Sequence, residues 1–249
     1  MKIFDFLIFI SHKLNMDRYS HLLYKLIIHS INKIKFILVF NLGVKVRSFS
    51  AMGQDTFIIE NVFKNKSKGL FIDIGASDGI SNNNTYIFEK YYNWRGFSIE
   101  PNPKLFKNLC KYRKSENFEI GIDKNNQKKI FVLQGHNSQI LDKKNKTNKS
   151  DIFIRSMTLN NFFKKNKINK IDLIDIDTEG NEFNILKNFN FKKYNVKCFL
   201  IERVSDKLNK LLRQNGFILV KKILLDYIYV NKDFGLNEIK YVKPPKRNF

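Results

Sequence analysis

The sequence predicts an α/β fold in which a largely parallel β-sheet is covered by helices on both faces. From residue 69 onward, short apolar runs that fit strands alternate with amphipathic runs that fit helices. This alternation is typical of parallel sheets built from β-α-β units. A glycine-rich turn follows the first strand, and acidic residues stand near the ends of several strands. Such sheets bind ligands at the carboxyl ends of their strands, so these residues predict a site there.

Strands are expected where short apolar or alternating runs end at turn-forming residues. The polar, Lys- and Asn-rich stretch 135–151 is expected to be a loop. The expected strands are residues 70–74, 96–100, 117–122, 129–134, 171–177, 196–202, 217–223 and 226–231.

Helices are expected where apolar residues recur at helical spacing next to capping residues. Asn82–Asn84 are candidate caps for the first helix, Pro103 fits the first turn of the second, and Thr158 fits the cap of the third. Gly216 ends the last helix. The expected helices are residues 85–93, 103–113, 158–166, 180–188 and 205–216.

The chain is strongly basic, with a net charge of +22 from 45 Lys and Arg against 23 Asp and Glu. This charge would suit nucleic acid, an anionic membrane or an acidic glycan as partner. A second explanation is composition alone, because Lys, Asn, Ile and Phe are all abundant, as in a protein encoded by AT-rich DNA. The two cysteines, Cys110 and Cys198, form neither a metal-ligand motif nor a disulfide framework, which fits a reducing cytoplasm.

The 249 residues suffice for one domain, 46–239, with an N-terminal extension, 1–45, and a basic tail, 240–249. The longest uncharged run in the extension, 36–44, is shorter than the roughly 18 apolar residues of a membrane-spanning helix. Apolar residues at three- and four-residue steps instead predict a basic amphipathic helix. This helix packs on its own domain or on a second subunit, or it lies peripherally on the inner face of an anionic membrane.

The glycine-rich turn has the spacing Asp73, Gly75, Gly79, which differs from the dinucleotide-binding pattern G-x-G-x-x-G. A pyrophosphate needs free backbone amides without negative charge nearby, whereas Asp73 and Asp78 place two acids at this turn. Two acids suit a cationic ligand. S-adenosylmethionine carries an ammonium and a sulfonium and has no phosphate.

A further acid, Glu100, indicates that the ligand contains a nucleoside. Glu100 ends the second expected strand, 25 residues after Gly75. An acid at this place accepts hydrogen bonds from the ribose hydroxyls in dinucleotide-binding folds. The alternative is that Glu100 binds local backbone amides. Taken with Asp73 and the glycine turn, Glu100 predicts a nucleoside cofactor, and the acids favour S-adenosylmethionine over NAD.

The third cluster lies in the segment 174–182. Leu173, Asp175 and Asp177 share one face of the expected strand. Glu179 and Glu182 follow at the start of a helix, where acids favour the helix dipole. That effect does not explain Asp175 and Asp177, because carboxylates in an apolar strand are costly unless they are paired. Their place at the end of a central strand predicts that they lie beside the cofactor.

Four segments of the chain, 50–58, 71–79, 84–103 and 171–191, resemble the FkbM-type S-adenosylmethionine-dependent methyltransferases in order and spacing. The resemblance runs from about Ser50 to Val230 and implies the Rossmann-like class I methyltransferase fold, with a mostly parallel seven-stranded sheet and helices on both faces. We therefore expect the domain 46–239 to be the catalytic domain. It also implies O-methylation of a sugar, glycan or related metabolite. The cofactor-binding residues that it implies, with those expected above, are Gln54, Asp55, Asp73, Gly75, Ala76, Ser77, Gly79, Asn84, Thr85, Glu100 and Asp177.

A hydroxyl group is a poor nucleophile, so a base is expected near the acceptor. Asp177 and Glu179 are the first candidates, and His136 is the second. Arg203 stands where relatives commonly carry a histidine, so a histidine base is not carried over to that position. No set of metal ligands is predicted. The extra carboxylate of Asp175 leaves room for a divalent cation beside Asp177, but the sequence does not require one.

Three other functions compete with this one. An RNA methyltransferase would share the fold and explain the charge, but the chain has no Asn-Pro-Pro-Tyr-type motif and no appended RNA-binding module. A nicotinamide oxidoreductase would carry G-x-G-x-x-G. A membrane-associated, non-enzymatic nucleoside-binding protein would explain the N-terminal helix but not the acidic strand ends. The expected partner is therefore a small-molecule or glycan acceptor rather than a specific nucleic acid, and the oligomeric state is left open.

Overall fold

The computed structural model describes residues 45–133, 138–141 and 151–234, together with Ser30 and Ile34. Most of the expected N-terminal helix, His136 and the basic tail 240–249 therefore lie outside the described residues. No helix in the described part of the chain is long and apolar enough to cross a membrane.

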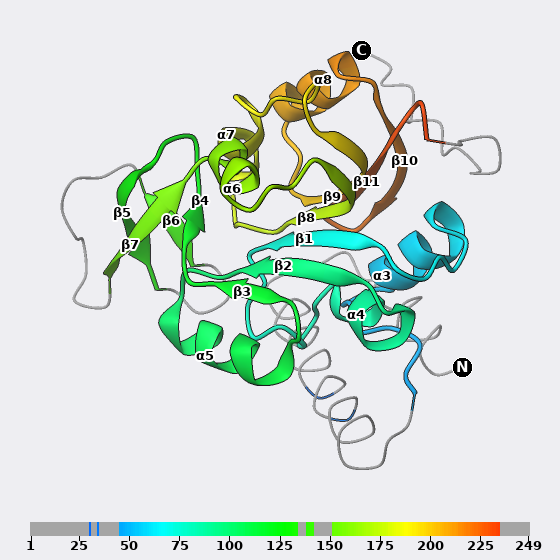
Figure 1. Cartoon of the computed structure of the whole chain (residues 1–249), viewed down its shortest axis with the longest axis horizontal. Helices are drawn as coiled ribbons and strands as arrows, with labels where there is room; N and C mark the ends of the chain where they lie inside the picture. Colours follow the sequence, from blue (N-terminus) through cyan, green and yellow to red (C-terminus); the bar gives the residue numbers. More distant parts are fainter. Residues whose placement is uncertain (1–29, 31–33, 35–44, 134–137, 142–150, 235–249) are drawn as a thin grey trace, which may run out of the picture.

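A mixed seven-stranded sheet forms the centre of the fold, in the order β10-β11-β9-β8-β1-β2-β3 (Figure 1). Strand β11 is antiparallel to both of its neighbours, and every other adjacent pair is parallel. The expected largely parallel sheet is confirmed, with one antiparallel strand. The strands are β1 (Leu70–Ile74), β2 (Arg95–Ile99), β3 (Glu116–Phe118), β8 (Lys170–Ile176), β9 (Asn195–Glu202), β10 (Phe217–Ile223) and β11 (Asp226–Asn231).

Helices cover both faces of this sheet (Figure 1). Capping side chains begin two of them as the sequence predicts: Asn83 Oδ1 accepts from Tyr86 N, and Thr158 Oγ1 accepts from Asn161 N. Ser205 Oγ, which was not predicted as a cap, accepts from Leu208 N at the start of a third helix. One face carries α6 (Leu159–Lys165), α7 (Glu182–Leu186) and α8 (Asp206–Gln214), and the other carries α3 (Gln54–Phe57), the π-helical turn η2 (Ile58–Val62) and α4 (Tyr86–Tyr92), while α5 (Pro103–Tyr112) follows β2.

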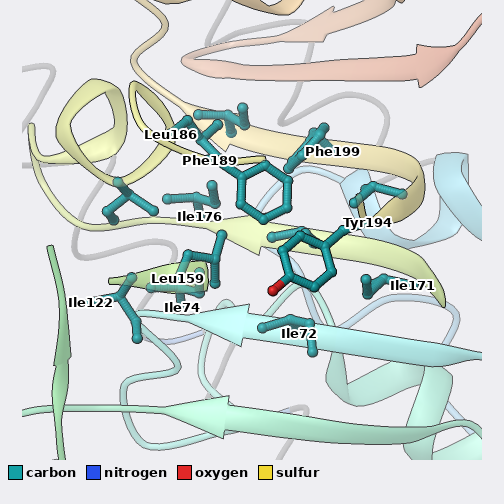
Figure 2. Packing of buried hydrophobic residues seen from close by; sticks show 14 of the residues in the cluster. Ile72, Ile74, Ile122, Leu159, Ile171, Ile176, Leu186, Phe189, Tyr194 and Phe199 are labelled. Atoms are coloured by element: carbon teal, nitrogen blue, oxygen red, sulfur yellow. The ribbon is translucent and has the colours of Figure 1, made fainter. Parts of the chain in front are cut away.

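Alternate residues of the central strands enter two separate hydrophobic clusters. Ile72 and Ile176 pack with Phe189 and Phe199 in the cluster beneath α6, α7 and α8 (Figure 2). Phe71 and Leu173 join the cluster on the opposite face. Burial of apolar surface on both faces stabilises the sheet, and it leaves polar side chains to gather at the strand ends.

A second, four-stranded sheet has the order β4-β7-β5-β6 and stands beside the main sheet (Figure 1). Its strands are β4 (Gly121–Ile122), β5 (Gln127–Val132), β6 (Gln139–Leu141) and β7 (Ile152–Met157). The prediction of a loop over 135–151 is therefore wrong at β6, which pairs antiparallel with β5. A strand this short gains its stability from its partner rather than from its own sequence. The single strand expected over 117–122 is also wrong, because β3 pairs in the main sheet and β4 in this one, and β7 was not predicted.

Candidate functional site

The register of the parallel strands brings the predicted residues to one edge of the sheet. Asp73 of β1 stands opposite Asp175 of β8, and Ile176 of β8 stands opposite Ile201 of β9. The residues that follow these positions leave the sheet side by side. Segments separated by more than a hundred residues in sequence therefore form one site, as expected for a parallel α/β sheet.

The glycine turn lies directly against the loop that follows β8. Asp177 N donates to Ile74 O at 3.0 Å, and the amides of Gly75 and Ala76 both donate to Ile99 O. Gly75 has φ +93°, and a Cβ on it would lie 1.8 Å from the carbonyl oxygen of Asp177. A glycine is therefore required where the three strand ends meet.

Glu100 is held beside this turn by two backbone amides. Its Oε2 accepts from Ser77 N at 2.9 Å, and its Oε1 accepts from Asn102 N at 2.7 Å. Burial raises the pKa of Glu100 to about 7. These two bonds are the local backbone contacts that the sequence analysis gave as the alternative to ribose binding. However, the two oxygens of a carboxylate can together accept about four hydrogen bonds, and only two are used here. Glu100 therefore keeps capacity for a ligand hydroxyl, and its role as a ribose ligand stays a prediction.

Asp73 is bonded to neighbouring protein groups. Its Oδ2 accepts from Thr85 Oγ1 at 2.6 Å and from Asn83 Nδ2 at 2.9 Å. Arg113 Nη1 lies 3.5 Å from the same oxygen. The positive charge of Arg113 balances Asp73, so the attraction of a cationic ligand rests on the other acids of the site. Asn83 and Arg113 were not among the predicted site residues.

Two further predicted residues reach the site through hydrogen bonds to acids. Asn84 Nδ2 donates to Asp175 Oδ1 at 3.4 Å. Gln54 Nε2 donates to Asp226 Oδ2 at 2.6 Å, which joins α3 to the start of β11. Asp226 is another residue that the sequence analysis missed. Its signal is its position as the first residue of a strand that pairs with Glu202.

The side chain of Asp55 bonds within its own segment. Its carboxylate accepts from Ser48 Oγ at 2.6 Å and from the amides of Phe49 and Ser50 at 2.7 and 3.1 Å. The residue is fully buried. These contacts explain why an acid is stable there, and the predicted place of Asp55 over the cofactor stays a prediction.

Three acids at the ends of β8 and β9 form a cluster. One carboxylate oxygen from each of Asp177, Glu179 and Glu202 lies within 4.8 Å of the others. Arg203 pairs with Glu179, and its Nε lies 3.5 Å from Glu202 Oε2. The candidate cation ligands are thus Asp177, Glu179 and Glu202, and Asp175 is not one of them. Glu202 could have been found from the sequence, because it ends its strand as Glu100 does.

Burial and neighbouring negative charges raise the pKa values of Asp177 and Glu202 in this cluster. Burial by the surrounding protein, and then the negative charges of Glu202 and Asp175, raise the pKa of Asp177 well above its ordinary range. Asp177 is exposed on its outer side, so we attribute more of this shift to the neighbouring charges than to burial. Burial and then Glu179 raise the pKa of Glu202 to about 7. Carboxyl groups of this kind can take up a proton near neutral pH.

His136, the second candidate base, cannot be placed relative to this site. None of the chain's four histidines is among the residues that the structure describes. Asp177 and Glu179 are therefore the candidate bases whose surroundings are known.

The chain is similar to known methyltransferases over much of its length. A model of the methyltransferase FkbM domain matches residues 73–219. No curated protein matches the chain. Among solved structures it is similar to a methyltransferase FkbM from Methylobacillus flagellatus, at 17% identity and a TM-score of 0.41, over 66% of this chain and 43% of that one. The chain thus spans less than half the length of that protein.

Two other solved structures show similarity at low identity. One is a methyltransferase from Pyrococcus furiosus, at 13% identity and a TM-score of 0.40, over 83% of this chain and 97% of that one. The other is a fibrillarin pre-rRNA processing protein from Methanococcus jannaschii, at 16% identity and a TM-score of 0.38, over 67% of this chain and 68% of that one.

Proposed function

Because the chain belongs to the FkbM methyltransferase domain family, we propose that it transfers a methyl group from S-adenosylmethionine to a hydroxyl group of a sugar, glycan or related metabolite. The observation that supports this proposal most directly is the meeting of the glycine turn with the acidic loop after β8, at Gly75 and Asp177. Its fold is the Rossmann-like class I methyltransferase fold.

The residues at the strand ends fit this cofactor. Glu100 offers acceptor positions for ribose hydroxyls beside the backbone of Ser77. Asp177, Glu179 and Glu202 outnumber the cation Arg203, and a net negative site suits a ligand with a sulfonium and an ammonium. When bound, S-adenosylmethionine supplies a methyl group that is already electrophilic. The chain then has to align the acceptor oxygen and exclude water.

The base in this proposal is Asp177. Its carboxyl is the exposed member of the acidic cluster, so an acceptor can reach it. Burial and the neighbouring charges of Glu202 and Asp175 raise its pKa, which increases its ability to take the proton of an acceptor hydroxyl. Carboxylates also accept hydrogen bonds from sugar hydroxyls, and we assign that role to Glu202 and Asp226, which pair at the adjacent strand ends.

Methyl transfer to a panel of acceptors tests the proposal. The full chain is incubated with S-adenosylmethionine carrying a labelled methyl group and with sugars, glycans or RNA in separate reactions. Label that enters a sugar hydroxyl, located by mass spectrometry and removed by Asp177→Asn, supports the proposal. Label that enters only RNA would support the RNA methyltransferase instead. A folded chain that does not bind S-adenosylmethionine at millimolar concentration would contradict both.

A further inference from the structure

Arg113 is a fully buried cation next to the glycine turn. Arg113 directly follows the last residue of α5, and its side chain is 0% exposed. A buried guanidinium is costly unless every part of it is paired. Here it donates four hydrogen bonds, three of them to residues between Gly79 and Thr85 and one to Glu89 of α4. Its Nε donates to Glu89 Oε2 at 3.0 Å, its Nη1 to Gly79 O at 3.1 Å and Asn83 Oδ1 at 3.0 Å, and its Nη2 to Thr85 Oγ1 at 2.9 Å.

These contacts concentrate on the cofactor turn, which we define as residues 75–85. Gly79 O, Asn83 and Thr85 all belong to it. Gly79 has φ +81°, and a Cβ on it would lie 2.7 Å from Arg113 Cγ, so the turn packs directly on this side chain. Glu100 holds the same turn from the other side at Ser77 N.

The charge of Arg113 also matters to the site. It lies 3.5 Å from Asp73 Oδ2 and so balances the acid at the end of β1. Its guanidinium carbon lies 5.2 Å from the ring centroid of Phe71 and 5.5 Å from that of Tyr86, so both rings stabilise the buried cation. A lysine carries the charge but cannot supply several donors in one plane.

We propose that Arg113 is a positioning residue that holds the cofactor turn in its ligand-binding conformation. It bonds to the far half of the turn, while Gly75 and Glu100 fix the near half. The proposal rests on the proposed function, because it presumes that the turn binds S-adenosylmethionine. It assigns Arg113 no contact with the cofactor.

The test compares buried charged residues at opposite edges of the sheet. Arg113→Lys and Arg113→Met are measured against Asp172→Asn in the full chain. Asp172 accepts from Lys66 Nζ at 2.8 Å, from Lys197 Nζ at 2.7 Å and from Leu70 N at 2.9 Å, at the amino ends of β1 and β8. Asp172 is a matched control because its substitution should also lower thermal stability, whereas the residue itself lies away from the turn.

Calorimetry with S-adenosylhomocysteine gives the dissociation constant, and hydrogen exchange of residues 76–85 reports on the turn. We expect both Arg113 variants to weaken binding by about tenfold or more. Exchange in the turn should rise in the unliganded protein, and KM for S-adenosylmethionine should rise more than kcat falls. Asp172→Asn should lower Tm without changing either binding or exchange in the turn.

A milder variant keeps the test decisive if Arg113→Met does not fold. Glu89→Gln removes the charged partner of Arg113 Nε outside the turn and should weaken binding severalfold, with faster exchange in residues 76–85. If folded Arg113→Lys and Glu89→Gln bind S-adenosylhomocysteine with unchanged affinity, this inference is overturned and the proposed function is not. A folded wild-type chain that does not bind S-adenosylhomocysteine would overturn the proposed function and this inference with it.

Discussion

The Cα of Gly75 faces the carbonyl oxygen of Asp177 so closely that a Cβ on Gly75 would lie 1.8 Å from that oxygen. The contact joins the turn after β1 to the acidic loop after β8. It also explains why the two motifs occur in one chain although they lie about a hundred residues apart. The hydrogen bond from Asp177 N to Ile74 O fixes the two segments at this distance.

Gly75→Ala should therefore damage both the fold and the site. The added methyl group clashes with backbone, which cannot rotate away, and φ is +93°. We expect a loss of about 2 kcal/mol or more in the free energy of unfolding and no measurable binding of S-adenosylhomocysteine. Urea denaturation and calorimetry check this. Gly216→Ala is the control, because Gly216 also has positive φ but its nearest contact would be 3.4 Å away in a flexible lysine. Equal effects of the two substitutions would contradict the argument.

The sequence predicted the central sheet well because its signals are local. Apolar runs such as Leu70–Ile74, with an acid near the strand end, identify buried strands and one edge of the sheet without further information. The strand β6 was missed because three residues in a polar stretch carry almost no signal of their own. Its pairing partner, β5, decides its conformation.

The site was predicted in part for the same reason. Glu100 and Asp177 were found because each stands at the end of an apolar strand. The glycine turn and the acidic segment after residue 174 then indicate that both belong to one site. Arg113 was missed because a cation at the end of an amphipathic helix is normally a solvated residue. Only the packing of α5 against the cofactor turn shows that it is buried. Glu202 ends its strand as Glu100 does and could have been found in the same way. Asp226 becomes a site residue only through its pairing with Glu202, which the sequence does not encode locally.

Cofactor binding should depend on pH through Glu100. Its pKa is raised from an ordinary 4.5 to about 7, so the folded state holds this proton over that interval and the unfolded state does not. The contribution of Glu100 to stability therefore falls as pH rises from about 4.5 to about 7. Affinity for S-adenosylhomocysteine should show the opposite trend, because the ionised carboxyl is the better acceptor for ribose hydroxyls. It should decrease as pH falls below about 7.

Glu100→Gln and Glu202→Gln separate this effect from other titrations, because Glu202 also has a pKa of about 7. We expect Glu100→Gln to weaken binding by about tenfold at pH 8 and to remove the pH dependence measured by calorimetry. Glu202→Gln should retain it. A pH dependence that survives in Glu100→Gln and disappears in Glu202→Gln would assign the titration to the acidic cluster instead.

Asp177→Asn should separate chemistry from cofactor binding. The amide keeps the shape of the side chain but cannot take up the proton of the acceptor. We expect turnover to fall by roughly a hundredfold or more, with the dissociation constant of S-adenosylhomocysteine nearly unchanged. Asp206→Asn, an exposed substitution in the first turn of α8, is the control and should alter neither quantity. If Asp177→Asn weakened binding as much as turnover, the role of Asp177 as the base would be wrong.

Turnover of the wild-type chain should not depend on a divalent cation. Arg203 already pairs with Glu179 and approaches Glu202, and so neutralises part of the charge that would attract a metal to these two acids and Asp177. Arg203→Ala removes this guanidinium and leaves three acidic side chains with oxygens within 4.8 Å. Their mutual repulsion should lower Tm, and added Mg²⁺ or Ca²⁺ should restore it, because a cation now binds the folded state. Arg155→Ala, at an exposed position of β7, should show no such response. Loss of wild-type turnover in chelator, with recovery on adding Mg²⁺, would show instead that the cluster binds a catalytic metal beside Arg203.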